Sequence, residues 1–377
     1  MATGQATPVV HVSTQVFRSP AGYVQGRETI EELGEHVAPI ASHATVLADA
    51  FVIDLLGDQV RESLEAADVT VSVDEFGGEC TESEIERVAA AHDDHGGDAL
   101  VALGGGKAID TARAAREHTG GTMVSVPTIA STDAPTSSVA VIYTEAGEFV
   151  EFHVYERHPD LVLVDTAVIA NAPTRFLRGG IGDALATWFE ADAAARSGAD
   201  TIFGARPTRT ALSIAELAYT TLREHARPAV EAVEEDAVTA SVEAVVEANT
   251  LLSGLGFESG GLAAAHAVHN GLTQLEATHE ATHGEKVAVG TLTQLVLEGR
   301  SDDVLLDVAG FVHEVGLPVT LSEIGLDDPS RDELAVAAEA ACAPDETIHN
   351  EPFPVEADDV LDALIGADAL GRRVSRD

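Results

Sequence analysis

The sequence predicts an α/β domain over about residues 1–173, followed by an all-helical domain over about residues 174–377. In the first half, short β-branched runs alternate with helical patterns, which is typical of a parallel sheet covered by helices. In the second half, alanine-rich amphipathic patterns continue almost to the end of the chain. The length of 377 residues also favours two domains, because single hydrophobic cores stop growing at about 250–300 residues.

Six apolar runs in the first half predict strands: Thr45–Leu47, Val69–Val73, Ala99–Leu103, Met123–Val126, Val139–Tyr143 and Leu161–Val164. Helical patterns lie between the first four of these runs: Leu55–Ala66, Glu82–His92 and Ala108–His118. The segment Ser138–His153 predicts a β-hairpin instead, with Glu145-Ala146-Gly147 as its turn.

The pattern changes at Asn171-Ala172-Pro173-Thr174. Pro173 would stop regular structure, and Thr174 can serve as a helix N-cap. The stretches that predict helices after this point are Asp183–Arg196, Arg209–Arg223, Ala229–Leu252, Gly261–Leu275 and Glu285–Leu297.

The chain is very acidic, with 64 Asp and Glu, 21 Lys and Arg, and a formal net charge of −43. Such a charge opposes binding to nucleic acid phosphates and to anionic membranes. Apolar residues make up 45% of the chain, unlike a disordered acidic protein. We therefore expect a folded protein that works at very high salt, where the Debye length falls to about 3 Å or less.

Three further observations bear on location. The stretch Met1–Pro8 lacks a basic region followed by an apolar one, so it does not predict a signal peptide. No apolar run approaches the roughly 20 residues that a membrane span needs. Cys80 and Cys342 lie far apart and fit no metal or redox spacing. We expect a cytoplasmic protein with free thiols.

A glycine-rich turn, Gly104-Gly105-Gly106-Lys107, follows the run Ala99–Leu103 and precedes a helix. Glycines allow positive φ and close backbone approach, and a helix N-terminus offers free N–H groups to an anion. These features indicate a pyrophosphate site, although a purely structural turn is the alternative. Lys107 is one of only two lysines in the chain. Asp49 ends an earlier strand, where a carboxylate can bind a ribose diol and favour NAD over NADP, or can simply face solvent.

Asp183, His266 and His283 belong to three different predicted helices. A carboxylate and two imidazoles are a common ligand set for a catalytic Zn²⁺ with one open position. Alternatives remain at this point: Asp183 follows three glycines and can be an N-terminal cap. His269 and His279 also compete, because His266/His269 and His279/His283 have helical metal-ligand spacing.

With these residues together, the chain resembles the glycerol dehydrogenases of the iron-containing/polyol alcohol dehydrogenase superfamily. The resemblance extends from Phe17 to about Glu298, and its most specific part is Pro127-Thr128-Ile129-Ala130-Ser131-Thr132-Asp133-Ala134-Pro135-Thr136-Ser137. It implies a dehydroquinate synthase-like fold: an N-terminal Rossmann-like NAD-binding domain, a helical C-terminal domain and a metal site in the cleft between them. It also implies a homo-oligomer, commonly an octamer.

The resemblance assigns roles residue by residue. It implies that Asp183, His266 and His283 bind Zn²⁺ or another divalent metal, and that Asp133 contacts the substrate. A histidine such as His266 or a water chain would carry the proton. Besides Gly104 and Gly105 of the turn, the implied NAD contacts are Asp49, Gly106, Lys107, Thr128, Ser131, Ser137, Val139 and Tyr143.

The expected reaction is NAD-dependent oxidation of glycerol to dihydroxyacetone. One alternative is oxidation of another polyol or vicinal diol on the same scaffold. A second is sn-glycerol-1-phosphate dehydrogenase, which needs cations for its substrate phosphate; the candidates here are Lys286, Arg175 and Arg178. A non-catalytic nucleotide-binding or structural protein is a third. The roles of Lys286, His269 and His279 stay open.

Overall fold

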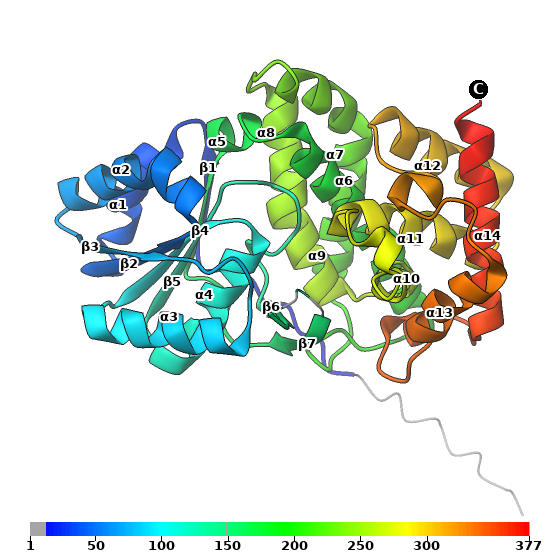
Figure 1. Ribbon diagram of the computed structural model, residues 1–377, viewed down its shortest axis with the longest axis horizontal. Coiled ribbons are helices and arrows are strands. Elements are labelled where there is room, and N and C mark those ends of the chain that lie inside the picture. The colour runs from blue at the N-terminus through cyan, green and yellow to red at the C-terminus, as the bar shows by residue number, and fades with distance from the viewer. Residues whose placement is uncertain (1–12, 146, 148, 377) are drawn as a thin grey trace, which may run out of the picture.

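The computed structural model describes residues 13–376, with the exception of residues 146 and 148. Figure 1 shows the main sheet at the left, and the helices from α6 onward in the centre and at the right. The strands are β1 (Tyr23–Gly26), β2 (His43–Ala48), β3 (Thr70–Glu75), β4 (Ala99–Gly104), β5 (Thr122–Pro127), β6 (Val139–Tyr143), β7 (Phe149–Val154) and β8 (Leu161–Asp165). The helices are α1 (Leu33–Val37), α2 (Ala50–Ala66), α3 (Glu82–His95), α4 (Gly106–Thr119), α5 (Thr166–Ala170), α6 (Thr174–Ser197), α7 (Arg209–Val233), α8 (Ala240–Glu247), α9 (Ser253–Gly260), α10 (Ala264–Leu272), α11 (His283–Leu297), α12 (Asp302–Glu314), α13 (Arg331–Ala341) and α14 (Ala357–Val374).

The main sheet is parallel throughout, in the order β1-β8-β5-β4-β2-β3. Helices α1 and α2 pack on one face of it, while α3 and α4 pack on the other. Strand β4 is buried along its whole length, so it carries a continuous apolar run instead of an alternating one. The predicted parallel sheet covered by helices is confirmed.

The predicted hairpin is present as β6 and β7, which pair antiparallel from Val139↔Val154 to Tyr143↔Phe149. Ala146 of the expected turn lies outside the described residues. On β7, Phe149 and Phe152 are exposed.

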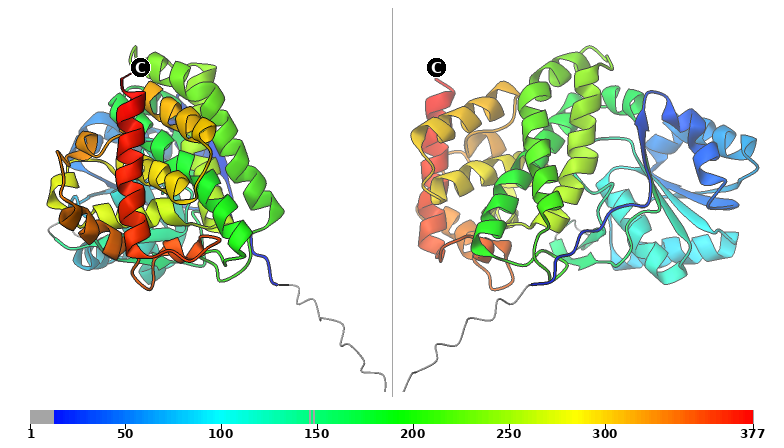
Figure 2. Two further views of the ribbon diagram at one scale, coloured as in Figure 1. Left: turned by 90° about the vertical axis from the view of Figure 1, so that its right-hand side faces the viewer. Right: turned by 180° about the vertical axis from the view of Figure 1, so that it is seen from behind.

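Strand β1 was not predicted from the sequence. It pairs parallel with β8 in the register Tyr23↔Val162. A run of four half-buried residues gives little local signal, and its partner lies about 140 residues further along the chain. The segment before β1 lies against the helical part of the chain, where Gln15 forms a bridge with Arg206. Figure 2 (right) shows this segment continuing from there to the sheet.

Helix α6 begins at Thr174, so a helix start near Asp183 was wrong. Its N-cap is Pro173 rather than Thr174, and no side chain caps it. Glycines cost stability inside a helix, but here they permit contact with neighbouring backbone. A Cβ placed on Gly180 would lie 2.0 Å from the Ala130 carbonyl oxygen, and one on Gly182 would lie 2.3 Å from that of Gly284.

Two other predicted helices have different bounds. The stretch predicted as one helix over Ala229–Leu252 is split: α7 runs through Pro228 to Val233, and Thr239 caps a new helix, α8. A π-helical turn, Ala248–Leu252, follows α8. The helix predicted over Gly261–Leu275 is shorter and begins at Ala264. Gly261 cannot belong to it, because its φ of +108° lies outside the helical region.

The expected boundary at residue 173 falls between α5 and α6. Among the described residues after it, no strand is present apart from the isolated bridge at Arg206. The division into two domains stays a prediction. Within the described part of the chain, no helix combines the length and apolar character that a membrane crossing requires.

Candidate active site

Several expected cofactor residues lie at one edge of the sheet. Asp49 follows β2, the glycine turn follows β4, and Thr128 follows β5. These strands are adjacent and parallel, so their carboxyl ends meet at the same edge. The strand order reverses between β2 and β4, and ligands of open α/β sheets bind at such reversal points.

The glycine turn is built differently from its prediction. Gly105 is the N-cap of α4 with a φ of −85°, and none of the three glycines has a positive φ. Close packing accounts for them instead: a Cβ on Gly105 would lie 3.0 Å from Ile129 Cδ1, and one on Gly104 would lie 3.1 Å from Ala108 Cβ. Because the N-cap Gly105 has no side chain, the first N–H groups of α4 have no side-chain cap and can bind an anion.

Lys107 has a partner that the sequence did not indicate. Its Nζ donates to Glu79 Oε2 over 2.6 Å, and it lies 5.3 Å from the centroid of the Tyr143 ring. The lysine side chain is half exposed. The structure thus brings two expected NAD contacts, Lys107 and Tyr143, together at the start of α4.

The other expected NAD contacts have local structural bonds. Asp49 caps α2, because its Oδ1 accepts from Val52 N over 2.9 Å. Ser137 Oγ accepts from Val139 N over 3.0 Å. The Val139 carbonyl accepts from buried Arg113, which also binds the Ala134 carbonyl and so fixes the loop between β5 and β6.

That loop connects the sheet edge to the helices. A Cβ on Gly106 would lie 3.5 Å from Thr132 Oγ1, and a Cβ on Gly179 would lie 3.5 Å from the Ser131 carbonyl oxygen. Residues 131–132 therefore lie against both α4 and α6.

Asp183, His266 and His283 converge from α6, α10 and α11. Asp183 Oδ1 lies 3.1 Å from His283 Nε2 and 3.3 Å from His266 Nε2. One ligand-type atom from each of the three residues lies within 4.8 Å of the other two. The Asp183 side chain is 1% exposed and that of His283 is 37% exposed, so the cluster opens to solvent on the His283 side.

The Asp183 carboxylate and the two imidazoles are close enough to shift one another's pKa values. Burial alone would raise the pKa of Asp183, but His283 and His266 hold it well below its usual range. Burial alone would lower the pKa of His266, but Glu190 and Asp183 raise it well above its usual value. A buried anion between two imidazoles is a place where a cation is stabilised.

Asp133 lies beside the cluster. Its backbone N–H donates to Asp183 Oδ2 over 3.3 Å, and its Oδ2 accepts from Ser253 Oγ over 3.1 Å. Burial and the neighbouring Asp183 raise the pKa of Asp133 well above its usual value. Thr187 in turn bonds Ser253 over 2.8 Å. Sequence reasoning missed Ser253 and Thr187; the one available signal was that Thr187 follows Asp183 by four residues on one helix face.

The competing histidines are outside the Asp183–His266–His283 ligand set. His269 is buried, its Nδ1 bonds Asn270, and its ring lies 4.2 Å from that of His283. His279 bonds the Thr273 carbonyl. Lys286 is buried and donates to the Thr278 carbonyl.

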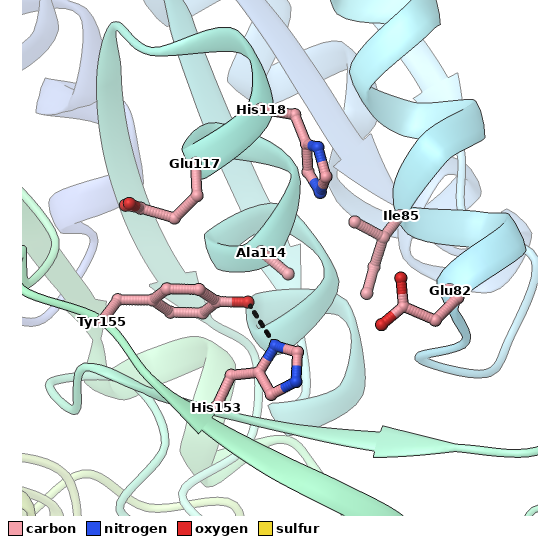
Figure 3. A pocket seen from close by; sticks show the side chains of 7 residues that line it. All are labelled: Glu82, Ile85, Ala114, Glu117, His118, His153 and Tyr155. Atoms are coloured by element: carbon pink, nitrogen blue, oxygen red, sulfur yellow. Dashed lines mark hydrogen bonds between the residues drawn. The ribbon is translucent and has the colours of Figure 1, made fainter.

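A separate hollow of about 280 Å³ lies between α3, α4 and β7 (Figure 3). Its lining includes Glu82, Glu117, His118 and His153, but none of the expected site residues. Glu82, Glu151 and His153 form a second group that could hold a metal ion, but both glutamates are exposed. Exposed acidic groups of this kind are common in a chain with 64 acidic residues. We therefore place the candidate active site at the buried cluster.

Comparison with known proteins identifies the family. The profile of the family "Iron-containing alcohol dehydrogenase" matches residues 20–166. A glycerol dehydrogenase from Escherichia coli is 47% identical over 95% of this chain and 98% of its own. The chain belongs to the iron-containing alcohol dehydrogenase family. It is therefore an oxidoreductase.

Two further relatives within this family are informative. A glycolaldehyde reductase from Halobacterium salinarum is 59% identical over 96% of this chain and 99% of its own. The crystal structure of glycerol dehydrogenase from Schizosaccharomyces pombe superposes with a TM-score of 0.93 at 38% identity, covering 96% of this chain and 92% of that one. The family fold is thus present over nearly the whole chain.

Proposed function

We propose that this enzyme oxidises glycerol to dihydroxyacetone with NAD at a divalent metal, Zn²⁺ in the first instance. The observation that carries the proposal is the convergence of Asp183, His266 and His283 beside Asp133. The glycerol dehydrogenases at 47% and 38% identity support the choice of polyol.

The ligand set fits a metal. Asp183, His266 and His283 would supply one anionic oxygen and two imidazole nitrogens, a combination typical of catalytic Zn²⁺ sites. A metal bound there would lower the pKa of an alcohol hydroxyl. The partly exposed face of His283 leaves a side from which a small polyol can approach.

Asp133 would orient the polyol. Ser253 holds its Oδ2, while its Oδ1 has no hydrogen-bond partner among the described residues. A carboxyl with one oxygen fixed and the other open can bind a substrate hydroxyl in a defined direction. Thr187 supports this arrangement through Ser253.

The sheet edge would hold the cofactor, whose chemistry is the acceptance of a hydride. Gly104, Gly105 and Gly106 would let the pyrophosphate approach the start of α4, with Lys107 beside it. Asp49 would face the ribose and disfavour a 2′-phosphate. The remaining proposed NAD contacts are Thr128, Ser131, Ser137, Val139 and Tyr143.

A second candidate is the reduction of glycolaldehyde, because the relative of that name is 59% identical to this chain. Glycolaldehyde and dihydroxyacetone both carry a hydroxyl next to the carbonyl, so one site can orient either. A phosphorylated glycerol is disfavoured. Arg175 is paired with Glu285, Arg178 is paired with Glu234, and Lys286 is buried against a carbonyl.

Turnover with a substrate panel tests the proposal. NADH formation would be measured at molar KCl with glycerol, 1,2-propanediol, 2,3-butanediol and ethylene glycol, and NADH consumption with dihydroxyacetone and glycolaldehyde. We expect the highest kcat/KM with glycerol and dihydroxyacetone, and loss of activity on adding a chelator. A higher kcat/KM with glycolaldehyde would establish the second candidate. Full activity in the chelator would contradict a metal-dependent reaction.

A further inference from the structure

Helix α10, which bears His266, begins without a cap from its own sequence. Its N-cap residue, Ala263, has no side-chain acceptor, and Ala264 and Ala265 follow. The first N–H groups of a helix have no partner within the helix, and leaving them buried and unbonded would destabilise the fold. Acceptors must therefore come from other elements.

Three distant side chains supply them. Glu190 Oε1 accepts from Ala263 N over 2.9 Å and from His266 N over 3.0 Å. Glu351 Oε1 accepts from Ala264 N over 3.3 Å, and Gln294 Oε1 accepts from Ala265 N over 2.9 Å. The start of α10 is thus held from outside by α6, α11 and the segment before α14.

Glu190 differs from the other two because it also contacts the imidazole. Its Oε2 lies 2.5 Å from His266 Nδ1, and its side chain is 0% exposed. It follows Asp183 by seven residues on α6, about two turns, so both carboxylates lie on one face of that helix. One helix therefore supplies the anion of the cluster and the anion behind His266.

This contact selects the tautomer of His266. An ionised carboxylate only accepts hydrogen bonds, and Glu190 Oε1 already accepts two. His266 Nδ1 must then carry a proton, so the nitrogen that can offer its lone pair to a metal is Nε2. That nitrogen is the one facing Asp183 Oδ1. Carboxylates commonly fix metal-binding histidines in this way.

We infer that Glu190 is a positioning residue that fixes the ring and the tautomer of His266 for metal binding. The inference rests on the proposed function, since it assumes a metal at Asp183, His266 and His283. Glu190 itself would not touch metal or substrate.

The test is Glu190→Gln, read out by Zn²⁺ affinity in competition with a chromophoric chelator. The amide oxygen can keep the bonds to Ala263 N and His266 N, but the amide NH₂ would donate to Nδ1. The proton then moves to Nε2, where it faces the cluster. We expect the Zn²⁺ dissociation constant to rise about 10- to 100-fold. The same affinity as the wild type would overturn the inference.

Glu351→Gln is the matched control. It makes the same carboxyl-to-amide change at the same helix start, but it does not touch the imidazole, so Zn²⁺ affinity should stay unchanged. An equal loss in both variants would mean that Glu190 acts only as a helix cap. If Glu190→Gln does not fold, ¹⁵N shifts of the wild-type, metal-free, histidine-labelled protein decide instead. A proton on His266 Nδ1 supports the inference, and an Nδ1 without a proton refutes it.

The proposed function and the role of Glu190 are tested by different results. If the wild type binds no Zn²⁺ at Asp183, His266 and His283, the proposed function fails. If the wild type binds Zn²⁺ and Glu190→Gln binds it equally well, only the role of Glu190 fails.

Discussion

Asp183 is almost fully enclosed, and protein groups replace the water that an exposed carboxylate would have. Two imidazoles face Oδ1, and the Asp133 N–H donates to Oδ2. A buried carboxylate without such partners would destabilise the fold by several kcal/mol. The same partners that make this position tolerable for an anion also make it suitable for a metal.

Lys107 permits a prediction at the scale of one residue. A hydrogen bond to a charged group contributes about 1.5–3 kcal/mol, so Lys107→Gln should raise KM for NAD at least about tenfold with little change in kcat. Steady-state kinetics at molar KCl measure both constants. Arg61→Gln is the control, because it removes a charge from an exposed pair on α2. An unchanged KM for NAD would remove Lys107 from the cofactor site.

Glu351 permits a prediction about pH. Burial, with Glu298 nearby, raises the pKa of its carboxyl to about 8 from an ordinary 4.5. The folded state therefore binds this proton more tightly than the unfolded chain. The protonated carboxyl therefore contributes stability that is complete below about pH 4.5 and is lost as pH rises through about 8.

The measurement is chemical denaturation of wild type and Glu351→Gln at molar KCl. The glutamine cannot ionise, so the variant should gain on the order of 4 kcal/mol over wild type between about pH 5 and about pH 9. If the two free energies of unfolding change in parallel over that range, Glu351 does not titrate as described.

At the scale of elements, the site depends on how closely α6, α10 and α11 approach one another. A Cβ on Gly284 would lie 1.8 Å from the Gly179 carbonyl oxygen, and one on Gly290 would lie 2.3 Å from that of Ala265. These glycines set the spacing of the helices that carry Asp183, His266 and His283. The backbone contacts substitute for larger side chains at these crossings.

We predict that Gly284→Ala separates α6 from α11. Overpacking typically costs about 1–3 kcal/mol, and Zn²⁺ affinity should fall with it. Gly310 in α12 is the control: a Cβ there meets nothing within 4 Å, so Gly310→Ala should stabilise by about 0.5–1 kcal/mol. Chemical denaturation measures the stability of both variants, and a Zn²⁺ titration of each measures its affinity for the metal. Equal stabilities and affinities would show that the glycine contact is not required.

The sequence predicted those features whose signals are local. Short apolar runs predicted β2 to β6 and β8, and the hairpin pattern predicted β7. Motifs and the family resemblance proposed Asp183, His266 and His283, which the fold brings together. The start of α6 was predicted wrongly, because the glycines before Asp183 indicate a turn in the sequence. In the structure they lie inside α6, where Gly179 and Gly182 pack against Gly284. Sequence reasoning missed β1, Glu190 and Ser253, because each acts through a partner that lies far away in the sequence.

At the scale of the molecule, we expect the net charge of −43 to make stability depend on salt. Like charges oppose the compact state, and salt screens them. The thermal midpoint should therefore rise steeply between dilute buffer and molar KCl, and any assembly should be lost at the low end. Differential scanning calorimetry and size-exclusion chromatography across KCl concentrations measure this. A salt-independent midpoint would contradict this account.

The central claim is that Asp183, His266 and His283 hold the metal on which alcohol oxidation depends. The most direct measurement determines metal content per chain and kcat with glycerol on the same preparations of wild type and Asp183→Asn. Asparagine keeps the shape but removes the anion. The account predicts that the variant remains folded, loses its metal and loses kcat by roughly 10³-fold or more. A variant that retains both the metal and the wild-type kcat would contradict it.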